Sequence, residues 1–78
     1  MQTDQATYAP RVAAAVENAM TERGFNTKTL AEATLIPRAT LQRRLLGISP
    51  LTVAELAAIA TALGVQPGDL VPPMAGAA

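Results

Sequence analysis

The sequence predicts an all-α fold, a compact bundle of four to five short helices, and two observations support this prediction. Half of the residues are apolar and many of these are alanine, the residue with the highest helix propensity. Apolar residues also recur at the three- and four-residue spacing of amphipathic helices, in segments separated by glycine and proline. A chain of 78 residues is sufficient for one domain. Its core is expected to be aliphatic, because there is one Tyr, one Phe and no Trp.

The first helix is predicted to begin near Pro10, because proline suits the first turn of a helix. Residues 1–9, which precede it, are expected to form a disordered N-terminus. Gly24 is expected to end the helix, with Phe25 folding back onto its last turn. The apolar residues that recur at helical spacing in this segment are Val12, Ala15, Val16, Ala19 and Met20.

A short second helix is predicted over about Thr27–Thr34, with Asn26 as its N-cap. Leu30 and Ala31 are the residues that this helix is expected to bury.

The third helix is predicted to open at Pro37, after a bend at residues 34–36. The residue before a proline avoids the helical region, so the chain cannot continue the second helix through this point. The helix is expected to run to about Leu46 and to end at Gly47, a second C-cap glycine.

A fourth helix is predicted after Thr52, which forms a capping box with Glu55 three residues later. Gly64 is expected to end it, and a last short helical turn follows at residues 66–70. The tail, residues 72–78, contains proline and small residues and is predicted to be disordered. The expected buried residues of these two elements are Val53, Leu56, Ile59, Ala60, Leu63 and Leu70.

The third helix carries an unusual set of residues away from its core side. Leu41 and Leu45 fall within about 40° of each other on a helical wheel and define that core side. The other residues are Ala39 and Arg43 opposite it, Arg38 and Gln42 along one edge, and Thr40 and Arg44 along the other. Arginine binds guanine and glutamine binds adenine in a bidentate manner, and alanine allows close approach to a thymine methyl group. One interpretation of this face is therefore that it contacts nucleic-acid bases. The alternative interpretation is an ordinary solvated face.

The distribution of charge favours the first interpretation. The net charge is zero, but four basic residues and one acidic residue lie between Thr27 and Gly47. No acidic residue occurs between Ile36 and Pro50, although a solvated face would normally intersperse both signs. Positive charge is therefore concentrated in one segment, as a local nucleic-acid contact requires.

Several functional classes are not expected. Without Cys or His the chain lacks a thiolate, the commonest general base and the commonest metal ligand, and it has no glycine-rich phosphate loop. We therefore expect no enzyme, no cofactor and no metal. No apolar run approaches the roughly 20 residues of a membrane span, and the start MQTDQATYAP does not resemble a signal peptide. The protein is expected to be cytoplasmic.

The segment TKTLAEATLIPRATLQRRLLG resembles the helix-turn-helix of the lambda-repressor/Cro-like family, the XRE group of bacterial and phage regulators. Thr27 falls at the first motif position, Ala31 at the small fifth position and Gly47 at the glycine that closes the recognition helix. Ile36 and Leu41 fall at the two buried positions. The flanking segments RGF and AIATALGVQPGDLV also match, so the resemblance covers about residues 10–71.

One position departs from the family pattern. Leu35 stands in the turn where the family usually has glycine, and a left-handed conformation would cost a leucine roughly 1 kcal/mol. Either the turn has a different geometry, or the leucine tolerates the strain because its side chain is buried. Leu46 also has no polar role and is expected to pack on the fourth helix or in a dimer contact.

The resemblance implies a sequence-specific regulator of transcription, a repressor, that binds double-stranded DNA with the third helix in the major groove. A palindromic operator and a homodimer, formed through the fourth helix and the C-terminal turn, are expected. An antitoxin-like or other protein-interaction module, with a protein partner, is the alternative. The implied base-contacting residues are Arg38, Ala39, Gln42 and Arg43. The implied phosphate-contacting residues are Asn26, Thr27, Lys28, Thr40 and Arg44.

Overall fold

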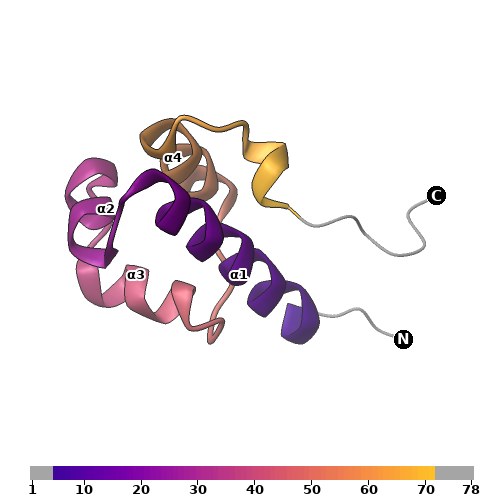
Figure 1. Cartoon of the computed structure of the whole chain (residues 1–78). Helices are drawn as coiled ribbons and strands as arrows, with labels where there is room; N and C mark the ends of the chain where they lie inside the picture. Colours follow the sequence, from indigo (N-terminus) through magenta and orange to yellow (C-terminus); the bar gives the residue numbers. More distant parts are fainter. Residues whose placement is uncertain (1–4, 72–78) are drawn as a thin grey trace.

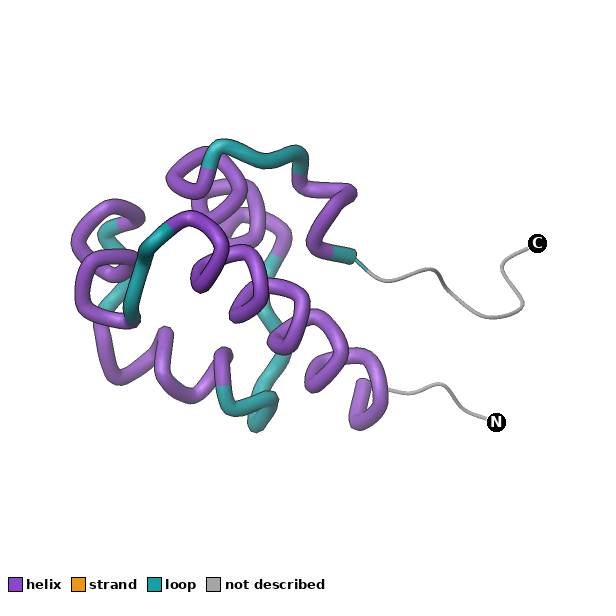
Figure 2. Tube along the Cα trace, in the orientation of Figure 1, coloured by secondary structure: helices purple, strands orange, loops and turns teal. Residues whose placement is uncertain are grey.

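The computed structural model describes residues 5–71, and within this range the fold is all-α, as predicted. The elements are α1 (Gln5–Arg23), α2 (Thr27–Thr34), α3 (Arg38–Leu45), α4 (Val53–Leu63) and the 3-10 helix η1 (Pro67–Leu70). Short loops connect them (Figure 2). In Figure 1, α1 runs diagonally across the molecule, and α2 and α3 lie together at one end of it. The predicted tail, residues 72–78, lies outside the described residues.

The start of the first helix differs from the prediction. α1 begins at Gln5, and Pro10 lies inside it, so the prediction of disorder was wrong for residues 5–9. A proline within a helix removes a single backbone hydrogen bond, and the helix extends past this position because Ala9 is buried against the rest of the fold. Residues 1–4 lie outside the described residues.

The core draws on every element. The five largest fully buried side chains come one from each helix and one from η1: Val16, Leu30, Leu41, Ile59 and Leu70. All five are aliphatic, and Phe25 is a partly buried neighbour of this cluster, as the composition predicted. Each such side chain stabilises the fold by roughly 1.5–3 kcal/mol relative to exposure. The core therefore holds the short helices together, since helices of this length are unstable alone.

The fourth helix begins and ends as predicted, with one exception in its apolar stripe. Thr52 and Glu55 form the reciprocal capping box, and Gly64 ends the helix. Ile59, Ala60 and Leu63 are buried, whereas Val53 is 86% exposed, so its predicted burial was wrong. Val53 is the first residue of α4 and lies on the rim of a groove with Ala9 and Val12 of α1. The apolar stripe of α4 therefore extends past the edge of the core.

The end of α3 is fixed against α1 by a close backbone approach. Gly47 has φ +76°, and a Cβ atom built on it would lie 3.0 Å from the Cα atom of Pro10. A side chain here would press on the backbone of α1, and the left-handed φ adds a conformational cost, so glycine is favoured for two reasons. This contact positions the C-terminal end of α3.

Candidate nucleic-acid interface

The α2–α3 turn adopts the left-handed geometry that normally requires glycine. Leu35 has φ 63° and ψ 20°, and its N–H donates to the carbonyl of Ala31 at 2.9 Å. Its side chain is 88% exposed, so burial does not explain how the leucine tolerates this conformation, and that alternative was wrong. The turn has the geometry that a glycine would give, and the leucine bears the conformational cost.

Neighbouring residues hold the turn in place. Thr34 donates through Oγ1 to the carbonyl of Leu30 at 2.8 Å, and the same oxygen accepts from the N–H of Ile36 at 3.3 Å. Ile36 is buried in the core. The side chain of Thr34 thus gives the amide after the turn a partner, a role that the sequence pattern did not indicate.

The outer face of α3, which we define as Arg38, Ala39, Gln42 and Arg43, lies in solvent. All four of its residues are exposed, while Leu41 and Leu45 on the other side are buried. This confirms the orientation that the helical wheel predicted. The base contacts assigned to these residues stay a prediction, but their side chains are free to approach a ligand.

Leu46 lies three residues after Arg43, the last residue of the outer face. It is 72% exposed, so the predicted packing on α4 was wrong. Its N–H still donates to the carbonyl of Gln42 at 3.0 Å, and its φ of −81° and ψ of −4° keep it in helical conformation. On the wheel it lies near Ala39, seven residues earlier. The exposed side of α3 therefore ends in an apolar side chain.

The start of α2 is capped and presents free amides. Asn26 accepts through Oδ1 from the N–H of Thr29 at 2.8 Å, and Thr29 accepts through Oγ1 from the N–H of Asn26 at 2.9 Å. The N–H groups of Thr27 and Lys28 lie in the first turn, where a helix offers no carbonyl partner. The side-chain oxygen of Asn26 is committed to the cap, so those two amides are the groups that suit an anion.

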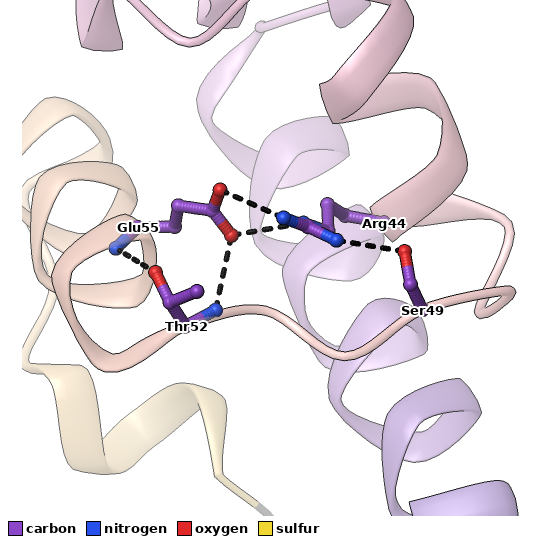
Figure 3. A network of polar contacts seen from close by, with 4 residues as sticks. All are labelled: Arg44, Ser49, Thr52 and Glu55. Carbon is purple, nitrogen blue, oxygen red and sulfur yellow. Dashed lines mark hydrogen bonds and ion pairs between the residues drawn. The ribbon is translucent and has the colours of Figure 1, made fainter.

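Arg44 occupies a different environment from the one predicted. Its Nε donates to Oε1 of Glu55 at 2.9 Å and its Nη2 donates to Oε2 at 3.1 Å, while its Nη1 donates to Oγ of Ser49 at 2.8 Å (Figure 3). The side chains of Arg44 and Glu55 are each only 18% exposed. The phosphate contact predicted for Arg44 is therefore not supported by its surroundings. Although no acidic residue lies on α3, one from α4 neutralises this arginine.

Glu55 serves two partners at once. Its Oε1 also accepts from the N–H of Thr52 at 3.0 Å, which completes the capping box of α4. Burial raises the pKa of Glu55, but the hydrogen bonds from Arg44 and from the backbone of Thr52 outweigh it, so the pKa is lowered from its ordinary value. The carboxylate is therefore charged at neutral pH. We refer to Arg44, Ser49, Thr52 and Glu55 as the Arg44–Glu55 network.

Sequence reasoning identified part of this network. The Thr52-x-x-Glu55 pattern predicted the cap, but the ion pair joins residues that are 11 apart and separated by a loop. Residues separated by a loop in this way do not produce a periodic pattern in the sequence, so the ion pair could not be predicted from it. Ser49, in the same loop, carried no signal either.

Other kinds of site are not evident in the described residues. Between residues 5 and 71, no group of three or more His, Cys, Asp or Glu side chains is placed to hold a metal ion. None of the helices in that range has the length and apolarity needed to cross a membrane.

The arrangement of two short helices about a tight turn, with the second exposing Arg and Gln opposite a buried stripe, defines a helix-turn-helix DNA-binding protein. Residues 16–74 match the family model described as the Cro/C1-type HTH DNA-binding domain, and the chain belongs to this family. This confirms the resemblance seen in the sequence, and transcription regulation fits the family. No curated protein matches the chain significantly.

Proposed function

We propose that this DNA-binding protein is a sequence-specific repressor of transcription that inserts α3 into the major groove of double-stranded DNA. The observation that supports this most is the outer face of α3, whose four residues are exposed while the other side of the helix is buried. A rigidly held helix with exposed bidentate side chains is suited to base recognition. Action on DNA would place the protein in the cytoplasm of a bacterial or phage-infected cell.

The outer face provides the base contacts in this proposal. Arg38 and Arg43 each present a guanidinium that matches the O6 and N7 atoms of guanine, and Gln42 presents an amide that matches adenine. Ala39 allows close approach and contacts a thymine methyl group. A preference for guanine at two positions of each half-site follows from this assignment.

The start of α2 and one edge of α3 provide the phosphate contacts. The first-turn amides of Thr27 and Lys28 and the ammonium group of Lys28 bind one phosphate, with Asn26 holding that turn in place. Thr40 lies half-buried at the edge of the outer face, where its hydroxyl group reaches the backbone of the groove. Arg44 is left out of this set, because Glu55 and Ser49 already bind it.

The experiment that tests the proposal is selection of bound duplexes from a random pool, followed by measurement with Arg43→Ala. The variant should lose about 1–3 kcal/mol of specific binding and relax the preference at one base pair. Arg23→Ala is the matched control, since Arg23 is exposed at the end of α1, outside the outer face. No enrichment in the pool, or equal affinity of Arg43→Ala and wild type, would contradict the proposal.

A protein-interaction module, such as an antitoxin that holds a partner protein, is the second candidate. It is favoured by the exposure of four large apolar side chains, Leu35, Leu46, Ile48 and Val53, and by the zero net charge. Under this alternative the random pool would yield no preferred duplex. Replacing Leu46 and Ile48 by polar residues would then abolish partner binding.

A further inference from the structure

The Arg44–Glu55 network joins α3 to α4, a helix whose backbone lies apart from that of α3. α3 packs on α1 and α2, but every Cα atom of α3 stays more than 8 Å from the Cα atoms of α4. Arg44 crosses this gap and binds both oxygens of Glu55, in the first turn of α4. It also binds Ser49, in the loop between the two helices (Figure 3). One guanidinium therefore ties the end of α3 to the start of α4.

This link acts on the rotation of α3 about its own axis. Leu41 and Leu45 lie on one stripe of a helix that is only eight residues long, and a single stripe resists rolling less than two separated contacts do. Arg44 projects from the edge of α3 next to Leu45, so it adds a polar contact to α4 beside the packing of α3 on α1 and α2. A planar guanidinium bound by both carboxylate oxygens also fixes direction as well as distance.

The other end of the link is rigid too. Oε1 of Glu55 accepts from the N–H of Thr52 as well as from Arg44, and the N–H of Glu55 donates back to the hydroxyl of Thr52. Glu55 is therefore held by the cap of α4 while it holds Arg44. A DNA phosphate would have to displace a carboxylate that already satisfies the guanidinium in a bidentate manner.

We propose that Arg44 and Glu55 are positioning residues for DNA recognition: their bidentate pair fixes the rotation of α3, so that the outer face meets the bases, and Arg44 itself contacts no phosphate. This inference rests on the proposed function of α3. It makes Glu55, an acidic residue, a requirement for specific binding to a polyanion.

The test compares specific and non-specific binding in three variants. Arg44→Met removes the pair and keeps much of the side-chain volume. Glu55→Gln removes the charge but keeps an oxygen that serves the capping box. Gly64→Ala is the matched control, because it strains the left-handed end of α4 at φ +76° and leaves the Arg44–Glu55 pair and the cap of α4 in place. The probes are the duplex selected by the wild-type protein and a shuffled duplex of the same length, used at a temperature where circular dichroism shows each variant to be folded.

We expect Arg44→Met and Glu55→Gln to lose specific affinity by about fivefold or more, the least expected from one lost bidentate base contact. Their affinity for the shuffled duplex should shift in opposite directions, because Arg44→Met leaves the Glu55 carboxylate unpaired and Glu55→Gln leaves the Arg44 guanidinium unpaired. The ratio of specific to non-specific affinity should fall in both variants. Gly64→Ala should lower the melting temperature and keep the ratio of specific to non-specific affinity. If Arg44→Met does not fold, Glu55→Gln gives the same test.

Two results would overturn the inference. If Arg44 binds a phosphate, Arg44→Met will weaken binding to both duplexes equally and flatten the salt slope by about 0.9. If the pair is only structural, both variants will melt earlier but keep the wild-type ratio of specific to non-specific affinity. Arg43→Ala, measured in parallel, separates these failures from a failure of the proposed function, because it loses specific binding only if α3 contacts bases.

Discussion

Leu35 combines a left-handed backbone with a side chain that is 88% exposed. The conformation costs an L-residue roughly 1–2 kcal/mol, and an exposed side chain recovers little of that cost through packing. We therefore expect Leu35→Gly to stabilise the protein by about 0.5–1 kcal/mol, after part of the gain is offset by the greater entropy of glycine in the unfolded chain. Thermal unfolding should show a melting temperature higher by roughly 2–8 °C.

The control for this prediction is Ala33→Gly, two residues earlier. Ala33 is also exposed but lies within α2, where glycine costs about 1 kcal/mol. If both substitutions lower the melting temperature, the strain assigned to Leu35 is absent.

At the scale of helices, the junction of α1 with the end of α3 depends on Gly47. Gly47→Ala should destabilise the protein by more than Gly24→Ala, although both glycines have nearly the same positive φ. Gly24 has open space around it, so an alanine there costs only the conformational term of about 1–2 kcal/mol. At Gly47 the new Cβ atom would also press on the backbone of Pro10, which adds about 1–3 kcal/mol of overpacking.

Urea unfolding of the two variants at one temperature measures this difference. If the two variants lose the same free energy of unfolding, the new Cβ atom at position 47 does not press on Pro10, and the prediction is wrong.

The Arg44–Glu55 network also makes the link between α3 and α4 sensitive to acid. Because the pKa of Glu55 is lowered in the folded protein from its ordinary 4.5, the folded state favours the charged carboxylate. The stabilisation is therefore complete above about pH 4.5, the unfolded value, and is lost as the pH falls through the folded-state pKa. Melting temperatures measured from pH 7 to pH 3 should fall less steeply for Glu55→Gln than for wild type.

If another carboxylate caused the acid sensitivity, the melting temperature of Glu55→Gln would fall with pH as steeply as that of the wild type. A pH profile of Glu55→Gln that is parallel to the wild-type profile would show that this residue is not the source.

The helices could be predicted from sequence because local signals set their ends. Asn26 and Thr52 cap their helices as expected, and Gly64 ends the fourth helix. The start of α1 was not predictable, because the packing of Ala9 overrides the usual place of a proline. Val53 was misassigned since periodicity gives the direction of a side chain but not whether the core extends that far.

For the candidate site, the wheel predicted which residues of α3 are exposed, and the structure confirms their placement. It did not predict the environment of Arg44. A wheel treats each helix alone, and the partner of this arginine comes from another helix. Charge counted along one segment is therefore a poor guide to the charge that a ligand meets.

At the scale of the whole molecule, one recognition helix reads only a few base pairs, so specific binding is expected to need two copies of the chain on half-sites about one DNA turn apart. Leu70 of η1 is buried and unavailable for pairing, while Leu46, Ile48 and Val53 are exposed around the α3–α4 connection. We predict that the selected duplex is palindromic and binds two chains. Light scattering of the complex measures this, and one chain per saturated duplex would contradict it.

The shared oxygen of Glu55 has a consequence for motion. Since Oε1 binds both the backbone of Thr52 and the side chain of Arg44, an opening that frees the first turn of α4 also frees the end of α3. These two helix ends should therefore open as one cooperative unit, visible as amide hydrogens of both segments exchanging with solvent at a common rate. A bound DNA that steadies α3 would then also slow exchange in the first turn of α4.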